Sequence, residues 1–464
     1  MNTQTSKPSV YFYNALSMNV SFLQVLIFLI IGIGTIILFT TRFKVPAFFA
    51  LLIACFIVGL GVHLPVLDII TTIKDGFGAI LKSLGLLIIL GTTLGLLLEH
   101  TGSTRTMATY ILKKVGEQNA PLAMSLTGFI VGLPIFCDSG YIVLSGLNNS
   151  IARRTGIPVT VMAVTMASGL YSVHCLIPPH PGAAAAAGTL GVDVGRLIVW
   201  GIVAAIPAML AGYAWALYAG KRELVVNKEP ARFEEAASGP PVLNSFLPIL
   251  VPIALIALKS FFTIDPLKST RLLNVLSILG DPVIALSAGI ILAFFCKRGW
   301  HKNEVSTLLQ EGIEKAGGIL VIIGAGGAFG AILAATKIGQ HISTFTALEG
   351  MGLLFPFLLT FILKTAQGSS TVAIITAASI VQPLLPALGL ASDTGRLLSV
   401  LAMGAGSMMI SHANDAYFWV ITKFSGLEMK SMLKVYSVAT ILMGIITLAI
   451  ATFFIAGTAP VYEF

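Results

Sequence analysis

The sequence predicts an all-α polytopic membrane protein made of two inverted repeats, each with five spans and one re-entrant hairpin. Hydrophobic residues make up 56% of the 464 residues, charged residues only 10%, and the mean hydropathy is +0.93. This composition is typical of membrane proteins rather than of soluble enzymes. Two short polar breaks, at 175–182 and 409–417, interrupt apolar stretches about half the chain length apart. Their spacing indicates a duplicated architecture.

The expected spans are apolar stretches of roughly the 20 residues that a bilayer core requires. They are 21–40, 46–63, 76–98, 196–219, 243–261, 279–296, 316–335 and 432–457. Two longer stretches, 158–190 and 393–425, contain the breaks and are expected to be broken helices. Non-helical backbone at membrane depth is tolerated only beside protein or a wet cavity, so the two breaks indicate a central site.

Two more apolar stretches, 121–150 and 352–386, are too long for one straight span and have polar, glycine-containing residues at their middle. We expect each to be a re-entrant hairpin, with tips at 137–140 (CDSG) and 367–371 (QGSST). The alternative is two true spans in each stretch, although about a dozen residues per arm is short for a crossing.

The basic residues predict the orientation. With the N-terminus outside, the loops at 41–45, 100–120, 150–157, 220–242, 297–315 and 423–434 face the cytoplasm and hold 18 of the 28 Lys and Arg residues. The positive-inside rule therefore favours periplasmic termini in a bacterial inner membrane. Each repeat, 1–220 and 243–464, then crosses an odd number of times, with 221–242 as a cytoplasmic linker. The first span is expected to be retained, because the residues before it lack a signal-peptide pattern.

The two hairpin tips have complementary chemistry. A carboxylate such as Asp138 near mid-membrane costs at least ~2.5–3.5 kcal/mol, so it must be paired, hydrated or protonated. It is suited to proton coupling, or alternatively to capping the second arm through the backbone of Ser139 and Gly140. The second tip offers Gln367, Gly368, Ser369, Ser370 and Thr371. Free backbone N–H groups and the helix dipole there favour an anion, such as an organic carboxylate.

The two breaks supply further candidates. His180 has a proline on each side, so the chain cannot be helical there, and His412, Asn414 and Asp415 occupy the second break. The histidines bind substrate or instead join helices, Asn414 is suited to binding hydroxyl groups, and Asp415 is a second candidate for proton coupling. Lys364 is expected either to neutralise the carboxylate of the substrate or to snorkel to the interface.

His174, directly before the first break, is a weaker candidate for the site, with simple packing as the alternative. Glu99 and His100 lie at the end of a span, where exposure to water is the default expectation.

Four motifs resemble the gluconate permease family, bacterial proton symporters for sugar acids within the ion transporter superfamily. They are GLPIFCDSGYIVL at 132–144, HCLIPPHPG at 174–182, AQGSSTVAIITAA at 366–378 and SHANDAYFW at 411–419. Ser139 and Ala183 depart from the residues usual in that family. The resemblance covers nearly the whole chain and implies proton-coupled import of a small hydroxylated monocarboxylate, such as gluconate, by alternating access in a homodimer. D-serine and glycerate-like hydroxy acids are the alternative substrates.

The remaining sequence features concern the functional class of the protein. The chain has no P-loop, HExxH or nucleophile-elbow pattern, and its four cysteines lack metal-like spacing. We expect no enzymatic activity, metal, cofactor or nucleic-acid partner; protons, the bilayer and an organic acid are the expected partners. A passive channel and an intramembrane enzyme using Asp138 or Asp415 remain as alternatives.

Overall fold

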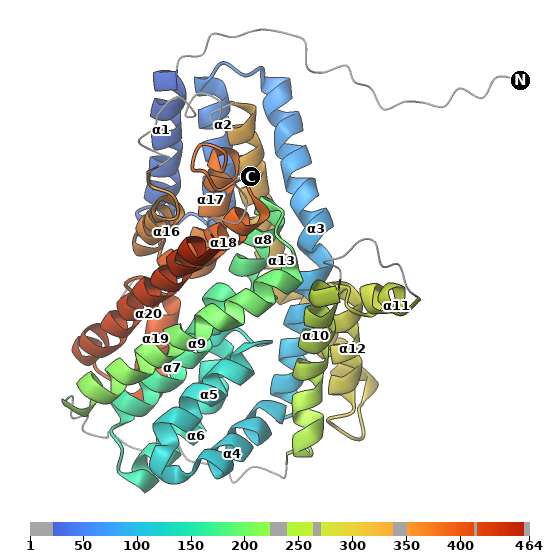
Figure 1. Cartoon of the computed structure of the whole chain (residues 1–464), viewed down its shortest axis with the longest axis vertical. Coiled ribbons are helices and arrows are strands. Elements are labelled where there is room, and N and C mark those ends of the chain that lie inside the picture. The colour runs from blue at the N-terminus through green and yellow to red at the C-terminus, as the bar shows by residue number, and fades with distance from the viewer. Residues whose placement is uncertain (1–21, 223–238, 263–270, 337–349, 413–414, 459–464) are drawn as a thin grey trace, which may run out of the picture.

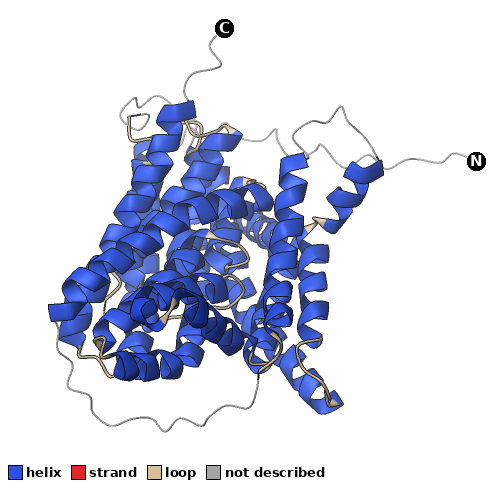
Figure 2. Ribbon diagram, turned by 60° about the horizontal axis from the view of Figure 1, so that its bottom comes forward, coloured by secondary structure: helices blue, strands red, loops and turns tan. Residues whose placement is uncertain are grey.

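The computed structural model describes residues 22–222, 239–262, 271–336, 350–412 and 415–458, and every element in these ranges is helical (Figure 2). In chain order (Figure 1) the elements are α1 (Phe22–Thr41), α2 (Ala47–Gly61), α3 (Val66–His100), α4 (Ser103–Val115), η1 (Glu117–Asn119), α5 (Ala120–Gly132), α6 (Cys137–Thr155), α7 (Val159–Leu176), α8 (Pro181–Leu190), α9 (Val194–Ala219), η2 (Gly220–Arg222), α10 (Val242–Phe262), α11 (Arg271–Leu279), α12 (Pro282–Phe294), α13 (Lys302–Ala335), α16 (Leu354–Gln367), α17 (Ser370–Val381), η3 (Gln382–Leu384), α18 (Asp393–Met408), α19 (Ala416–Ser425) and α20 (Met429–Thr458).

Seven helical segments in the described ranges are long and apolar enough to cross a membrane. The prediction of an all-α, multi-span protein is therefore confirmed. Most of the expected linker, and both ends of the chain, lie outside the described residues.

Two helices are longer than the expected spans. The sequence predicts spans at 76–98 and 316–335, but α3 begins at Val66 and α13 at Lys302. Neither N-terminal extension contains a proline, so nothing prevents the helix from continuing through the polar residues.

Helix α4 occupies a segment expected to be a loop, and its buried Met107, Ala108, Ile111 and Leu112 recur at helical spacing.

α3 and α13 are long helices that pack against each other as an antiparallel pair (Figure 1). A Cβ added at Gly76 would lie 2.6 Å from the carbonyl oxygen of Gly327, and one at Gly312 would lie 2.6 Å from Oγ1 of Thr93. Small residues at such crossings let two helix backbones approach closely, as is common in membranes. This pair places one wall of the cavity described below.

Each of the four stretches expected to be a hairpin or a broken helix forms a helix pair with a short interruption. α5 and α6 are separated by 133–136, α16 and α17 by 368–369, α7 and α8 by 177–180, and α18 and α19 by 409–415. The first interruption differs from the prediction, because the CDSG segment forms the first turn of α6 instead of the tip. The chain turns at 133–136: Leu133 still has helical dihedral angles, but Pro134 has no N–H with which to continue the helical hydrogen bonds.

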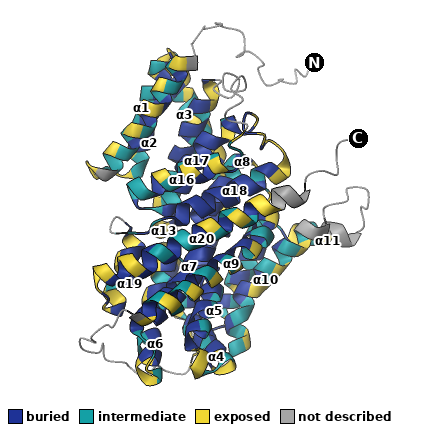
Figure 3. Ribbon diagram, turned by 60° about the vertical axis from the view of Figure 1, so that its left-hand side comes forward, coloured by how far each residue is buried: buried dark blue, intermediate teal, exposed yellow. Residues whose placement is uncertain are grey.

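The interrupted helices form the interior. Every residue of α7 is buried, and in Figure 3 α7, α8, α17 and α18 are mostly dark, while exposed residues gather on outer helices such as α1 and α4. Non-helical backbone in this interior needs partners. In the second break, the backbone N–H of Ser411 donates to Oγ1 of Thr440 at 3.1 Å, and the hydroxyl of Ser437 donates to the carbonyl oxygen of Ser411. α20 thus supplies the hydrogen bonds that the broken helix lacks.

Candidate functional site

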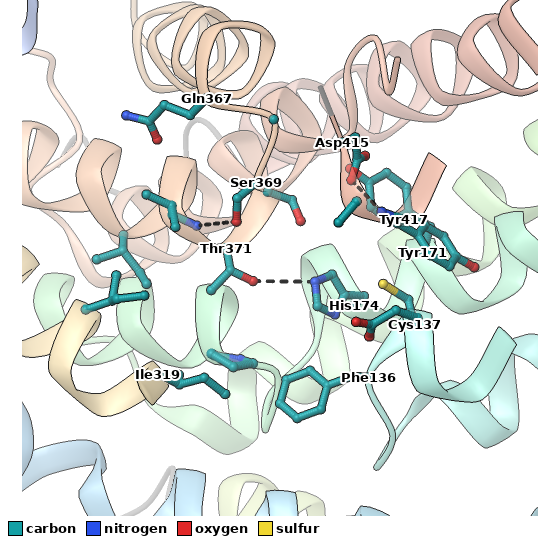
Figure 4. Close-up of a pocket in the computed structure, with 18 of the residues that line it drawn as sticks. Phe136, Cys137, Tyr171, His174, Ile319, Gln367, Ser369, Thr371, Asp415 and Tyr417 are labelled. Carbon is teal, nitrogen blue, oxygen red and sulfur yellow. Dashed lines mark hydrogen bonds between the residues drawn. The ribbon is translucent and has the colours of Figure 1, made fainter. Parts of the chain in front are cut away.

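The interruptions surround a cavity of about 640 Å³ (Figure 4). Its lining comes from both halves of the chain and comprises Phe136, Cys137, Asp138, Ser139, Tyr171, His174, Pro181, Lys315, Ile319, Ile322, Gln367, Gly368, Ser369, Ser370, Thr371, Val372, Ile375, Asp415, Ala416 and Tyr417. The volume lies within the roughly 300–1,000 Å³ range of small-molecule sites.

Four helices begin at this cavity. The first residues of α6, α8, α17 and α19 all belong to its lining. The first N–H groups of a helix have no partner within the helix, and the helix dipole makes this end positive. α6 and α8 have no side-chain cap, whereas Ser369 accepts a bond from the N–H of Val372 (3.3 Å) and Asp415 from that of Tyr417 (3.0 Å). The cavity therefore favours an anion.

The halves of the chain contact each other around these helix ends. A Cβ added at Gly182, in the first turn of α8, would lie 3.0 Å from Cδ1 of Ile374 in α17. On the other side of the cavity, the hydroxyl of Tyr417 in α19 donates to the carbonyl oxygen of Ala167 in α7 at 3.4 Å. The site is thus shared between the halves.

Asp138 is the free carboxylate of the cavity. It lies in the first turn of α6, is exposed, and makes no hydrogen bond or ion pair within the described ranges. α6 has no side-chain cap, so the alternative in which Asp138 caps this helix is wrong. The carboxylate of Asp138 is therefore open to the contents of the cavity.

Lys364 and Asp415 form a buried ion pair. Nζ of Lys364 has no exposed surface and lies 2.8 Å from Oδ2 of Asp415 and 2.6 Å from the carbonyl oxygen of Gly368. Asp415 also accepts a hydrogen bond from Ser411. Lys364 is outside the cavity lining and its side chain is fully buried, so this placement supports neither expectation for Lys364. The proton-coupling role expected of Asp415 is less favoured, because its oxygens already have partners.

The histidines of the two breaks also lie outside the cavity lining. Nε2 of His180 is 2.6 Å from the carbonyl oxygen of Gly132, to which it donates, so the first break is joined to the end of α5. His412 is half-buried, and its carbonyl oxygen accepts from the N–H of Asp415 at 2.8 Å. Gly140 is buried beneath the first turn of α6, against Leu170. Asn414 falls outside the described residues.

The cavity is also lined by residues that the sequence ranks low or does not indicate. His174, a weaker candidate with packing as its alternative, lines the cavity together with Tyr171 and Tyr417. Lys315 is the sole Lys or Arg in the described lining, and it also pairs with Glu311 at 2.9 Å. Lys315 has no sequence signal, because it lies in the part of α13 before the expected span.

A multi-span helical protein with a cavity between interrupted helices has the architecture of a membrane transporter. The particular family follows from sequence comparison: the chain belongs to the GntP family permeases, whose pattern matches residues 24–456. These proteins are permeases and not enzymes. The resemblance recognised from the four motifs is confirmed.

Relatives of the chain are named for different substrates. The chain is 32% identical over 428 residues to a gluconate permease of Pseudomonas aeruginosa, covering 90% of this chain and 94% of that protein. It is 31% identical over 430 residues to the D-serine transporter DsdX of Escherichia coli, covering 91% and 96%. The fold resembles the YdaH transporter of Alcanivorax borkumensis, with a TM-score of 0.63 and 15% identity over 85% of this chain and 89% of that one.

Proposed function

We propose that this permease imports a small hydroxylated monocarboxylate, preferably gluconate or a related sugar acid, together with a proton. In this proposal the two halves are inverted repeats that alternate the access of one site across a bacterial inner membrane, with both termini periplasmic. One observation carries the proposal: four helix N-termini and one unpaired carboxylate, Asp138, line the same cavity.

The cavity matches both parts of such a substrate. The helix N-termini are suited to the carboxylate. Gln367 and Ser370 are suited to the hydroxyl groups, and both amide atoms of Gln367 are buried without a partner among the described residues. An amide both donates and accepts, which a hydroxyl group can satisfy in either direction.

Proton coupling follows from the charge that the substrate brings. Two like charges roughly 4 Å apart repel by about 4 kcal/mol at an effective dielectric constant of ~20. A proton that enters the cavity with the anionic substrate removes this repulsion. Because substrate and proton stabilise each other in the cavity, they are carried together.

The test is uptake by purified protein in proteoliposomes. Asp138→Asn should still exchange labelled gluconate across the membrane but should lose accumulation driven by a pH gradient, since an amide releases no proton. Asp281→Asn is the matched control: Asp281 caps α12 away from the cavity, and asparagine caps equally well. Accumulation by Asp138→Asn at the wild-type level contradicts the proposed coupling, and uptake by wild type without any dependence on the gradient indicates a passive channel.

The second candidate substrate is D-serine or a glycerate-like hydroxy acid, which the similarity to DsdX favours. Asp138 would then pair with the ammonium group of D-serine. A thermal-shift series with D-gluconate, D-glycerate and D-serine separates the candidates, because a ligand that binds only the folded state raises the melting temperature in proportion to the logarithm of its concentration.

A further inference from the structure

His174 lines the cavity and carries a hydrogen-bonding atom without a partner among the described residues. The residue lies in the last turn of α7, is only 8% exposed, and lines the cavity in Figure 4. Its Nδ1 is buried and has no partner among the described residues. Leaving such an atom unpaired costs roughly 1–3 kcal/mol, so it calls for an explanation.

The ring is held firmly in place. It stacks on Tyr171 with centroids 6.3 Å apart, meets the ring of His180 edge-on at 4.9 Å, and contacts Phe136 at 6.4 Å. Its other nitrogen, Nε2, lies 3.5 Å from Oγ1 of Thr371 in the first turn of α17. A ring fixed on three sides cannot turn Nδ1 toward another protein group.

We propose that Nδ1 of His174 binds a hydroxyl group of the substrate, and that Thr371 orients the ring for this contact. The inference rests on the proposed function, because it assumes a hydroxylated substrate in this cavity. An imidazole nitrogen is a donor or an acceptor according to the tautomer, and a hydroxyl group complements either. Through this contact, the substrate would touch the broken helix of the first half, which carries His174, beside the hairpin of the second half, which carries Thr371.

Two substitutions of His174 distinguish the roles of its two ring nitrogens. His174→Asn keeps an amide near the position of Nδ1, whereas His174→Gln keeps one near Nε2 and loses the atom at Nδ1. The probes are D-gluconate and its monodeoxy analogues, and the measurement is calorimetric affinity for purified protein. Wild type should prefer D-gluconate over one monodeoxy analogue by roughly 3- to 10-fold, which is the worth of one neutral hydrogen bond.

His174→Gln should lose this preference, and His174→Asn should keep more of it. Thr371→Val, which removes the group that orients the ring, should reduce the preference without abolishing it and serves as the second variant if a histidine substitution fails to fold. His63→Gln, an exposed histidine between α2 and α3, is the control and should match wild type.

The outcomes distinguish the two proposals. If wild type binds none of D-gluconate, D-glycerate and D-serine, the proposed function fails, and this inference fails with it. If wild type binds D-gluconate but His174→Gln and Thr371→Val keep full discrimination among the analogues, only the inference is overturned. A uniform loss of affinity for all analogues, with discrimination retained, likewise overturns it and shows that His174 supports the fold.

Discussion

Replacing Lys364 with methionine should destabilise the protein strongly. The substitution keeps most of the side-chain volume but removes the ammonium group, which lies 2.8 Å from Oδ2 of Asp415 and has no exposed surface. The carboxylate of Asp415, only 6% exposed, then remains buried with hydrogen bonds from Ser411 and Tyr417 but no positive charge.

The expected cost is roughly 3–5 kcal/mol of unfolding free energy, the range for removing one partner of a buried ion pair. The lost bond to the carbonyl oxygen of Gly368 adds about 1 kcal/mol. Equilibrium unfolding in mixed micelles of dodecylmaltoside and sodium dodecyl sulfate measures this difference.

The double variant Lys364→Met, Asp415→Asn separates the effect of the unpaired carboxylate charge from the effect of the changed side-chain volume. Asparagine leaves no unpaired charge and still caps α19, so the double variant should recover at least half of the loss. Lys82→Met is the control, because Lys82 is exposed and its loss should cost less than about 0.5 kcal/mol. A cost below about 1 kcal/mol for Lys364→Met, or a double variant no more stable than the single one, refutes the reasoning.

Two further predictions concern affinity and orientation. Ser370→Ala removes a hydroxyl group from the first turn of α17 at the cavity. It should weaken gluconate binding, measured by calorimetry, several-fold, because one neutral hydrogen bond contributes ~0.5–1.5 kcal/mol. Unchanged affinity would show that Ser370 does not bind the substrate. In intact cells, a cysteine replacing His63 should react with an impermeant maleimide, and one replacing Lys114 should react only after the membrane is opened, since the four native cysteines are buried in the structure. The reverse pattern contradicts the proposed periplasmic termini.

The sequence located the helices and their interruptions because these signals are local. A run of about 20 apolar residues predicts a helix in a bilayer wherever it occurs. The prolines around His180 exclude a helix there whatever surrounds them, and Gly368 adopts a positive φ of 84° at the turn between α16 and α17. Local chemistry also explains the misplaced first tip: the polar residues at 137–140 predict a turn there, but the helix ends earlier, beside Pro134, which has no N–H to donate.

Partners distant in sequence could not be predicted. Lys364 and Asp415 are 51 residues apart, and each alone suggested a functional role at the cavity. In the structure they neutralise each other. Asp138 was predicted with the same reasoning, yet only its position shows that it lacks a partner. Whether a membrane acid is free or paired depends on side chains brought together by packing.

By itself, therefore, the sequence determined the membrane class, the family, and the approximate places at which the helices are interrupted. Tertiary structure decided that these four helix ends face one cavity, that His174 lines it, and that His180 does not. The physical reason is the range of the interactions. Helix starts and breaks depend on backbone hydrogen bonds and dihedral limits within a few residues, whereas the contents of a cavity depend on contacts between segments hundreds of residues apart, such as the one between Thr371 and His174.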